Sequence, residues 1–163
     1  YVKGTLVKIR ICAIPGFKSN GSESQPGNRY SIAGANGNVI VNSRVSGAWL
    51  SLFNAAKKDG ITFGASSGFR SMAHQNALYA SNPGIAGVPG TSNHQTGLAI
   101  DLQGMSGKNI SARTCADRVT NPSSNYWTWM NNNAASFGFR QLTKEAWHWD
   151  PVIASYNCEG DGT

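Results

Sequence analysis

The sequence predicts a loop-rich α+β fold. Nineteen glycines, together with many serines and asparagines, interrupt the chain too often for a helical bundle. Three segments carry apolar residues at helical spacing, and several shorter runs have the pattern typical of strands. A length of 163 residues is enough for a buried core, so we expect one domain over residues 1–163.

The N-terminal part of the chain is predicted to hold two short strands and a long loop. Val7–Ile14 begins with alternating apolar and charged residues, which predicts a strand that ends at Pro15–Gly16. Phe17–Gly37 is rich in Ser, Asn and Gly and is expected to be a loop, or a loop with a short hairpin. Asn38–Asn42 is a short β-type segment.

The first predicted helix has Ser46 as its N-cap and apolar residues at helical spacing over Trp49–Ala56. Lys57–Lys58 suit the negative end of the helix dipole, and Gly60 ends the helix. Ile61–Ala65 then predicts a strand.

Two further helices are predicted, over Ser71–Ala80 and Tyr126–Phe137, the second ended by a glycine. The loop Ser81–Thr91, which follows the first of these two helices, contains two prolines and three glycines. The polar stretch Gln103–Asn125 has little periodicity and is longer than an ordinary connection, so it is a candidate lid or rim. Phe139–Leu142 is a candidate strand.

Charge and hydropathy indicate a protein without a membrane span. The formal net charge of +6 is spread along the chain, which fits solubility and also attraction to a polyanion such as a cell-wall polymer. Nucleic-acid binding would rest on charge alone, and we expect none. No apolar run approaches the roughly 18 residues of a membrane span. The chain begins at Tyr1 without a signal pattern, as expected of a mature or trimmed segment.

The three cysteines, Cys12, Cys115 and Cys158, share no CxxC spacing, which argues against a structural zinc knuckle. One disulfide with one odd thiol fits an extracytoplasmic protein, and three reduced thiols fit a cytosolic one. The pairing is open: Cys115 with Cys158 is one possibility, and Cys12 is an alternative partner for either.

A histidine and a carboxylate stand seven positions apart in Ser92–Leu102. Leu98–Leu102 alternates as a strand, which places Asp101 on the face opposite the larger apolar residues. If the chain were fully extended, the backbones of His94 and Asp101 would lie roughly 23 Å apart. A shared metal therefore requires the chain to fold back near Gly97.

His94, Asp101 and His148 together form a set of two imidazoles and one carboxylate, which suits zinc with a fourth position left for water. Taken singly, each has a simpler role in packing or capping. Zinc-bound water has a pKa of about 7 and needs a base nearby. Glu145 is the candidate base and is expected in a turn before the His148 strand. If Glu145 and His148 both faced the metal, Glu145 could instead be a ligand.

Several other side chains are candidates for substrate contact. Arg70 follows a Ser-Ser-Gly turn and is either a surface cation or a group that holds a substrate anion or oxyanion. Gln75 is either a solvated helix residue or a donor to substrate amides. Trp147 and Trp149 are expected to be mainly core aromatics. His74 lacks an acid at matching spacing and is left out of the site.

These segments resemble the D-alanyl-D-alanine carboxypeptidase family of zinc peptidases, in its VanY-like branch, whose fold is shared with the hedgehog signalling domain. The family pattern SGYRSxxxQ appears over Ser67–Gln75, with Phe69 in place of tyrosine. SxHxxGxAxD is met in full over Ser92–Asp101, and ExWH over Glu145–His148. The similarity runs over Val39–Asp150, with the three motifs in the right order.

The resemblance implies a small central, mainly antiparallel sheet flanked by about three helices. It implies one zinc ion held by His94, Asp101 and His148, with Glu145 as general base. Arg70 would stabilise the transition state or the substrate carboxylate. Further substrate contacts would come from Gln75, Ser92 and Trp147.

The implied substrate is a peptidoglycan stem peptide or its precursor, cut next to a D-amino acid by a secreted or cell-wall-associated monomer. The alternatives are an endopeptidase that cuts cross-links or L-Ala-D-Glu bonds, and a non-catalytic zinc-containing cell-wall binding module, against which Glu145 argues. Two positions depart from the family, because Ala146 replaces a common proline and Asp150 a common basic residue. Residues 1–38 match no known pattern, and their role stays open.

Overall fold

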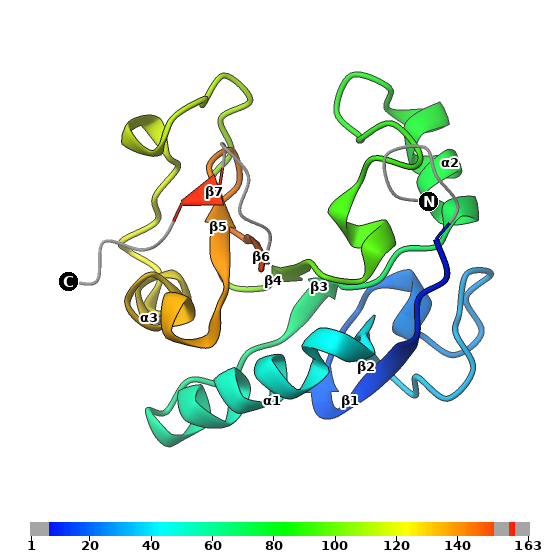
Figure 1. Ribbon diagram of the computed structural model, residues 1–163, viewed down its shortest axis with the longest axis horizontal. Helices are drawn as coiled ribbons and strands as arrows, with labels where there is room; N and C mark the ends of the chain where they lie inside the picture. The colour runs from blue at the N-terminus through cyan, green and yellow to red at the C-terminus, as the bar shows by residue number, and fades with distance from the viewer. Residues whose placement is uncertain (1–6, 152–156, 159–163) are drawn as a thin grey trace.

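The computed structural model describes residues 7–151 and 157–158. The predicted domain also includes residues 1–6, 152–156 and 159–163, which lie outside the described residues. Three α-helices and two antiparallel sheets in the described part confirm the predicted α+β class (Figure 1). Among the described residues, no helix has the length and apolar character needed to cross a membrane.

The elements follow one another in a mixed order along the chain. The helices are α1 (Ser43–Lys58), α2 (Met72–Ser81) and α3 (Asn125–Asn133). The strands are β1 (Ile11–Lys18), β2 (Asn38–Asn42), β3 (Ala65–Ser67), β4 (Ile100–Leu102), β5 (Arg140–Leu142), β6 (His148–Asp150) and β7 (Asn157–Cys158).

The larger sheet has the strand order β3-β4-β6-β5-β7, with every neighbouring pair antiparallel. The pairing of β4 with β6 sets Ile100 opposite Trp149 and Asp101 opposite His148. Because side chains alternate between the faces of a sheet, Ile100 and Trp149 enter the core, where both are fully buried. Asp101 and His148 then share the other face, although 47 residues separate them in the chain.

β1 and β2 form a separate two-stranded antiparallel sheet. The predicted bounds Val7–Ile14 are wrong for β1, which starts later and continues through Pro15–Gly16. Gly16 has a φ of +78°, and the register with β2 shifts between Ala13 and Lys18. The Pro-Gly step therefore makes an irregularity inside the strand and does not end it.

Helix α1 begins one turn earlier than predicted, because Asn42, not Ser46, is its N-cap. The Asn42 side chain accepts a hydrogen bond from the Arg44 backbone N–H at 3.0 Å. The buried face of the helix carries Trp49, Leu52, Phe53 and Ala56. The strand predicted over Ile61–Ala65 is also wrong: the ladder with β4 begins only at Ala65. Its apolar residues serve the core instead, with Phe63 packed against Phe53.

Helices α2 and α3 lie close to their predicted positions. Ser71 is the N-cap of α2, and its hydroxyl accepts from the His74 backbone N–H at 3.2 Å. After α3 the chain continues as a 3-10 helix, Ala134–Phe137, and Gly138 ends it in a left-handed conformation with a φ of +87°. This is the glycine stop expected from the sequence.

The core lies between α1, α3, the two-stranded sheet and the buried face of the larger sheet. Trp49 stacks on Phe139 with ring centroids 3.8 Å apart, and Trp149 is fully buried in the same cluster. Trp149 is therefore a core aromatic, as expected. In Figure 1, β4 and β6 lie in the middle of the molecule. α2 and the loop that follows it lie on one side of these strands, and β5, β7 and α3 lie on the other.

The polar stretch Gln103–Asn125 is largely irregular, with one short 3-10 helix at Cys115–Asp117. A disulfide joins Cys115 to Cys158 in β7, and Cys12 is a free thiol. The disulfide ties this stretch to the edge of the larger sheet.

Candidate metal centre

A tight turn brings His94 back toward Asp101. His94 lies in a 3-10 helix whose N-cap is Ser92, and Gly97 follows in a left-handed conformation with a φ of +72°. A side chain at Gly97 would also meet the backbone nitrogen of Asn42, which lies 2.7 Å from the position of an added Cβ. The predicted fold-back at Gly97 is confirmed, and glycine is required there both for its backbone conformation and for space.

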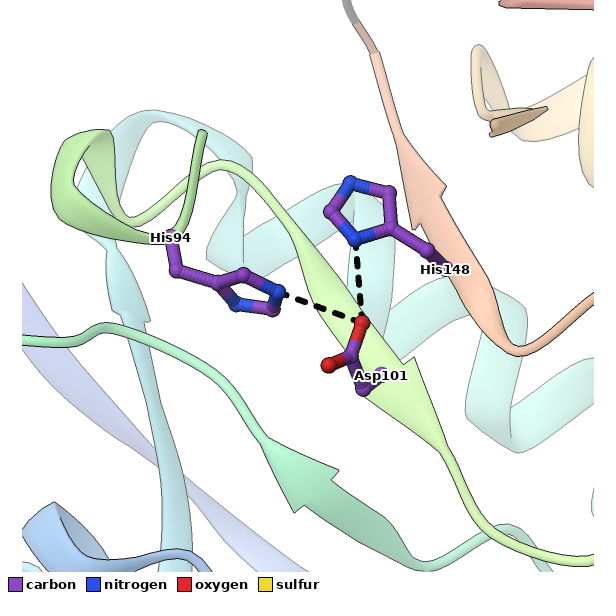
Figure 2. A group of neighbouring side chains, drawn as sticks. All are labelled: His94, Asp101 and His148. Atoms are coloured by element: carbon purple, nitrogen blue, oxygen red, sulfur yellow. Dashed lines mark hydrogen bonds and ion pairs between the residues drawn. The ribbon is translucent and has the colours of Figure 1, made fainter. Parts of the chain in front are cut away.

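Three side chains converge on one point (Figure 2). His94 Nε2 lies 3.2 Å from Asp101 Oδ1, and His148 Nδ1 lies 3.0 Å from the same oxygen. One ligand atom from each residue lies within 4.8 Å of the others. Both imidazoles are buried, and their rings meet edge to face with centroids 4.9 Å apart. This separation is within the reach of one metal ion, whose bonds to such atoms are about 2 Å long.

The donor set fits a zinc ion, because each imidazole already directs one nitrogen to the centre and the other to an acceptor. His94 Nδ1 lies 2.9 Å from the Gly68 carbonyl oxygen, which can only accept, so Nδ1 carries a proton and Nε2 is the nitrogen that faces the centre. His148 Nε2 lies 3.1 Å from Asp150 Oδ2, and its Nδ1 faces Asp101. Such outer contacts are typical of histidines that bind metals.

The electrostatics of the centre favour an ionised carboxylate. Burial alone would raise the pKa of Asp101, but the charge of His94 and hydrogen bonds from both histidines outweigh it and hold that pKa well below its usual range. Burial alone would lower the pKa of His148, but its hydrogen bonds to Asp101 and Asp150 raise it to about 10. Asp101 is therefore available as an anionic ligand.

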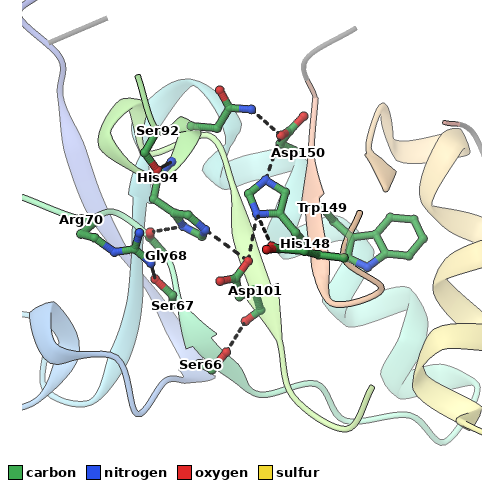
Figure 3. Close-up of polar contacts among 12 residues, drawn as sticks. Ser66, Ser67, Gly68, Arg70, Ser92, His94, Asp101, His148, Trp149 and Asp150 are labelled. Carbon is green, nitrogen blue, oxygen red and sulfur yellow. Dashed lines mark hydrogen bonds and ion pairs between the residues drawn. The ribbon is translucent and has the colours of Figure 1, made fainter. Parts of the chain in front are cut away.

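Two side chains hold Arg70 beside the centre, and Figure 3 shows one of them, Ser67. Arg70 Nη1 donates to Gln75 Oε1 and its Nη2 to Ser67 Oγ, both at 3.0 Å. Its backbone N–H also donates to the His94 carbonyl at 2.9 Å. Burial lowers the pKa of Arg70 from its usual value, while the charges of nearby acids including Asp101 act in the opposite direction. Arginine stays protonated in proteins, so the group is a fixed cation.

Gln75 lies behind Arg70 and not in the cavity. It is fully buried, and its Nε2 donates to the Gly87 carbonyl at 2.7 Å while its Oε1 accepts from Arg70. The predicted contact between Gln75 and substrate amides is therefore corrected: its amide is committed to Arg70 and to the loop after α2.

Glu145 lies in the turn before β6, as expected from the spacing. Its Oε2 is 4.0 Å from His148 Nδ1, and its Oε1 is 3.4 Å from Lys108 Nζ. Its side chain is 22% exposed, in contrast to the two buried imidazoles. Glu145 is not part of the group of three converging ligands. This position, beside the centre and open to solvent, suits a base better than a ligand.

A cavity of about 380 Å³ opens over the centre. Its walls come from the loop after α2, from the turn before β6 and from Lys108. The predicted site residues that line it are Arg70, Ser92, His94, Asp101, Glu145, Trp147 and His148. Trp147 lines the cavity and also packs against the core.

Lys108 at the cavity and the acidic partner of His74 were not predicted from the sequence. Lys108 lies in the polar stretch after β4, where no periodicity or motif marks it. His74 does have an acidic partner, because its Nδ1 lies 2.9 Å from Oε1 of Glu23, 51 residues earlier. Buried Glu23 also accepts from the Ser71 backbone N–H at 3.0 Å. The N-terminal region therefore holds the start of α2, the helix that carries Gln75.

Two curated proteins are similar to this chain in sequence. YodJ of Bacillus subtilis (strain 168) is 29% identical over 131 residues, which cover 66% of this chain and 45% of that protein. A D-alanyl-D-alanine carboxypeptidase of Enterococcus faecalis (strain ATCC 700802 / V583) is 26% identical over 138 residues, which cover 67% of this chain and 47% of that protein. The chain thus spans slightly less than half the length of these relatives.

The fold is shared with a solved structure of the LD-carboxypeptidase LdcB, with a TM-score of 0.59 and 24% identity. The match covers 86% of this chain and 66% of LdcB. The family model described as "VanY: D-alanyl-D-alanine carboxypeptidase" matches residues 38–152, which is more than half of the chain. The protein therefore belongs to the VanY family of D-alanyl-D-alanine carboxypeptidases.

Proposed function

We propose that this chain is a zinc-dependent peptidase that cuts peptide bonds next to D-amino acids in peptidoglycan stem peptides. The observation that carries the proposal is the convergence of His94, Asp101 and His148 beneath a cavity that also exposes Glu145 and Arg70. Membership of the VanY family and the similarity to the Enterococcus faecalis carboxypeptidase support the choice of substrate.

One zinc ion would be held by His94 Nε2, His148 Nδ1 and the Asp101 carboxylate. When bound, zinc supplies a Lewis acid and lowers the pKa of a water molecule to about 7. Two buried nitrogens and one carboxylate match the three protein ligands typical of catalytic zinc.

Glu145 would take the proton of the attacking water and pass it to the leaving amine. Its carboxylate is close to the centre, partly exposed and outside the ligand group, which are the properties that a proton shuttle needs. Arg70 would balance the negative charge that develops on the scissile carbonyl, or hold the substrate carboxylate. Its hydrogen bonds to Gln75 and Ser67 fix the guanidinium before substrate arrives.

Ser92 and Trp147 would form the walls of the substrate site, because both line the cavity. Trp147 offers a flat apolar surface for the small side chain of a D-amino acid. Ser92 also accepts from the His94 backbone N–H at 3.3 Å, so it supports the His94 turn from the cavity side.

We further propose one catalytic domain over residues 1–163 that acts as a monomer outside the cytoplasm. The N-terminal sheet and Glu23 contact α1 and α2, which supports a single folding unit. One chain supplies all three candidate metal ligands. The Cys115–Cys158 disulfide suits an oxidising compartment.

Mass analysis of the products from defined stem peptides tests the function. Zinc-loaded protein is expected to release the terminal D-Ala from a peptide that ends in D-Ala-D-Ala, and a chelator should stop the release until zinc is restored. Cleavage only within cross-linked peptides would place the activity among the endopeptidases. Failure of zinc-loaded protein to cut any of these peptides would contradict the proposal.

A further inference from the structure

A buried carboxylate stands behind the candidate metal centre. Asp150 is fully buried at the end of β6, two residues after His148. Its Oδ2 lies 3.1 Å from His148 Nε2 and accepts a hydrogen bond from Asn93 Nδ2 at 2.8 Å. Figure 3 shows the His148 ring between two carboxylates, with Asp101 on one side and Asp150 on the other. Because residues two apart in a strand share a face, β6 itself sets this arrangement.

The contact with Asp150 selects which nitrogen of His148 can bind a metal. A carboxylate oxygen at Nε2 accepts a hydrogen bond from that nitrogen, so when a metal replaces the proton on Nδ1 the remaining ring proton is held on Nε2. Nδ1, which lies 3.0 Å from Asp101 Oδ1, is then the nitrogen that faces the centre. For His94 the same selection comes from the Gly68 carbonyl and leaves the opposite nitrogen, Nε2, facing the centre.

The contact with Asn93 links the two histidine segments. Asn93 directly precedes His94 in the 3-10 helix, and 57 residues separate it from Asp150. One carboxylate therefore orients His148 and, through Asn93, also anchors the turn that carries His94. Neither motif of the sequence includes this connection, since Asn93 is a variable position of SxHxxGxAxD and Asp150 follows ExWH.

We propose that Asp150 is a positioning residue that prepares both histidines for zinc, by fixing the tautomer of His148 and by tying the His94 turn to β6 through Asn93. The inference rests on the proposed zinc function of the centre. Outer-shell partners of metal-ligating histidines typically contribute 10- to 100-fold to metal affinity. Removal of Asp150 should therefore weaken zinc binding even where the protein remains folded.

Zinc affinity, measured by competition with a chromophoric chelator, tests the inference. Asp150→Ala is expected to bind zinc about 10- to 100-fold more weakly than the parent chain. Asp150→Asn keeps an acceptor for the Nε2–H and should recover part of the loss. Asn93→Ala should give an intermediate loss, because only the anchor of the His94 turn is removed. If Asp150→Ala does not fold, Asp150→Asn and Asn93→Ala still test the inference.

Asn131→Ala is the matched control. Asn131 is buried and accepts from Arg118 Nη1 at 3.0 Å, in α3 and outside the candidate centre. Asn131→Ala should lower thermal stability but leave zinc affinity within about twofold of the parent value. If the role of Asp150 were purely structural, Asp150→Ala would likewise lower thermal stability and leave zinc affinity unchanged. Nitrogen NMR of the zinc-loaded parent should show His148 protonated on Nε2.

The outcomes separate the two proposals. A parent chain that binds no zinc would overturn the proposed function and this inference with it. A parent chain that binds zinc, with folded Asp150→Ala or Asp150→Asn binding equally well, would overturn only the role of Asp150. An Asn93→Ala variant with parental affinity would overturn the link between the two histidine segments.

Discussion

Glu145 combines nearness to the candidate metal centre with access to the cavity. Its two carboxylate oxygens face different groups, His148 Nδ1 at 4.0 Å and Lys108 Nζ at 3.4 Å. A zinc ligand needs an oxygen about 2 Å from the ion, and Glu145 does not belong to the group of three converging residues. The position beside that group is the one from which a carboxylate can exchange protons with water.

Glu145→Gln should therefore keep zinc and lose hydrolysis. The amide retains the size of the side chain but cannot accept the proton, and general-base catalysis typically contributes 10²- to 10⁴-fold to the rate. The measurement is kcat on a D-Ala-D-Ala peptide together with zinc content. A variant with the parental kcat would show that another group is the base.

Gln75→Ala should lower kcat/KM, although Gln75 does not line the cavity. The substitution removes the acceptor of Arg70 Nη1 and the donor to the Gly87 carbonyl, and it should destabilise the fold by about 1–3 kcal/mol. Gln141→Ala is the control, since Gln141 is also fully buried but bonds Trp127 and the Val119 carbonyl. A similar loss of stability with unchanged kcat/KM is expected there. Equal effects of both variants on kcat/KM would contradict the positioning role.

At the scale of single residues, the sequence predicted the site residues that lie close together in the chain. His94 and Asp101 are local to one turn, so a strand pattern and one glycine were enough to place them. Lys108 and the Glu23 partner of His74 reach their positions through contacts between distant segments, which no local pattern encodes. Asp150 was visible only as a departure from the family pattern, without a role.

Among the elements, the turn at Gly97 decides whether His94 meets Asp101. Gly97→Ala should destabilise the protein and weaken zinc binding, because an added Cβ would lie 2.7 Å from the Asn42 nitrogen as well as straining the backbone at a φ of +72°. The left-handed conformation alone costs roughly 1–2 kcal/mol for a residue with a Cβ.

Gly138→Ala separates the effect of backbone strain from the effect of crowding at Asn42. Gly138 has a φ of +87°, but an added Cβ would have nothing within 4 Å. It should show the backbone penalty alone, with zinc affinity unchanged. Thermal unfolding and zinc competition of both variants provide the comparison, and equal effects at the two glycines would rule out the crowding at Asn42.

Element boundaries were predicted less well than element types. Asn42 ends β2 and also caps α1, so the helix starts directly after the strand and Ser46 is left inside it. Ile61 and Phe63 have the apolar character of a strand but pack against the core, since pairing with β4 starts only at Ala65. In both cases tertiary contacts decided between two local patterns that the sequence allowed.

For the whole molecule, the disulfide joins the stretch that carries Lys108 to the edge of the larger sheet. Cys115 and Cys158 are 43 residues apart, and closing a loop of that length stabilises a protein by about 4 kcal/mol in the chain-entropy view. Cys115→Ser should lower the melting temperature by roughly 8–16 °C and remove its dependence on reductant. Cys12→Ser should leave that dependence intact. A reductant effect that survives Cys115→Ser would contradict the pairing.

Zinc titration of the metal-free protein tests the central claim most directly. The three-residue centre predicts that hydrolysis of a D-Ala-D-Ala peptide is absent after chelation and returns to its maximum at one equivalent of zinc. Asp101→Ala should bind zinc far more weakly and remain inactive at that concentration. Full activity after complete removal of metal, or a parental titration curve for Asp101→Ala, would contradict the assignment of His94, Asp101 and His148 as the zinc site.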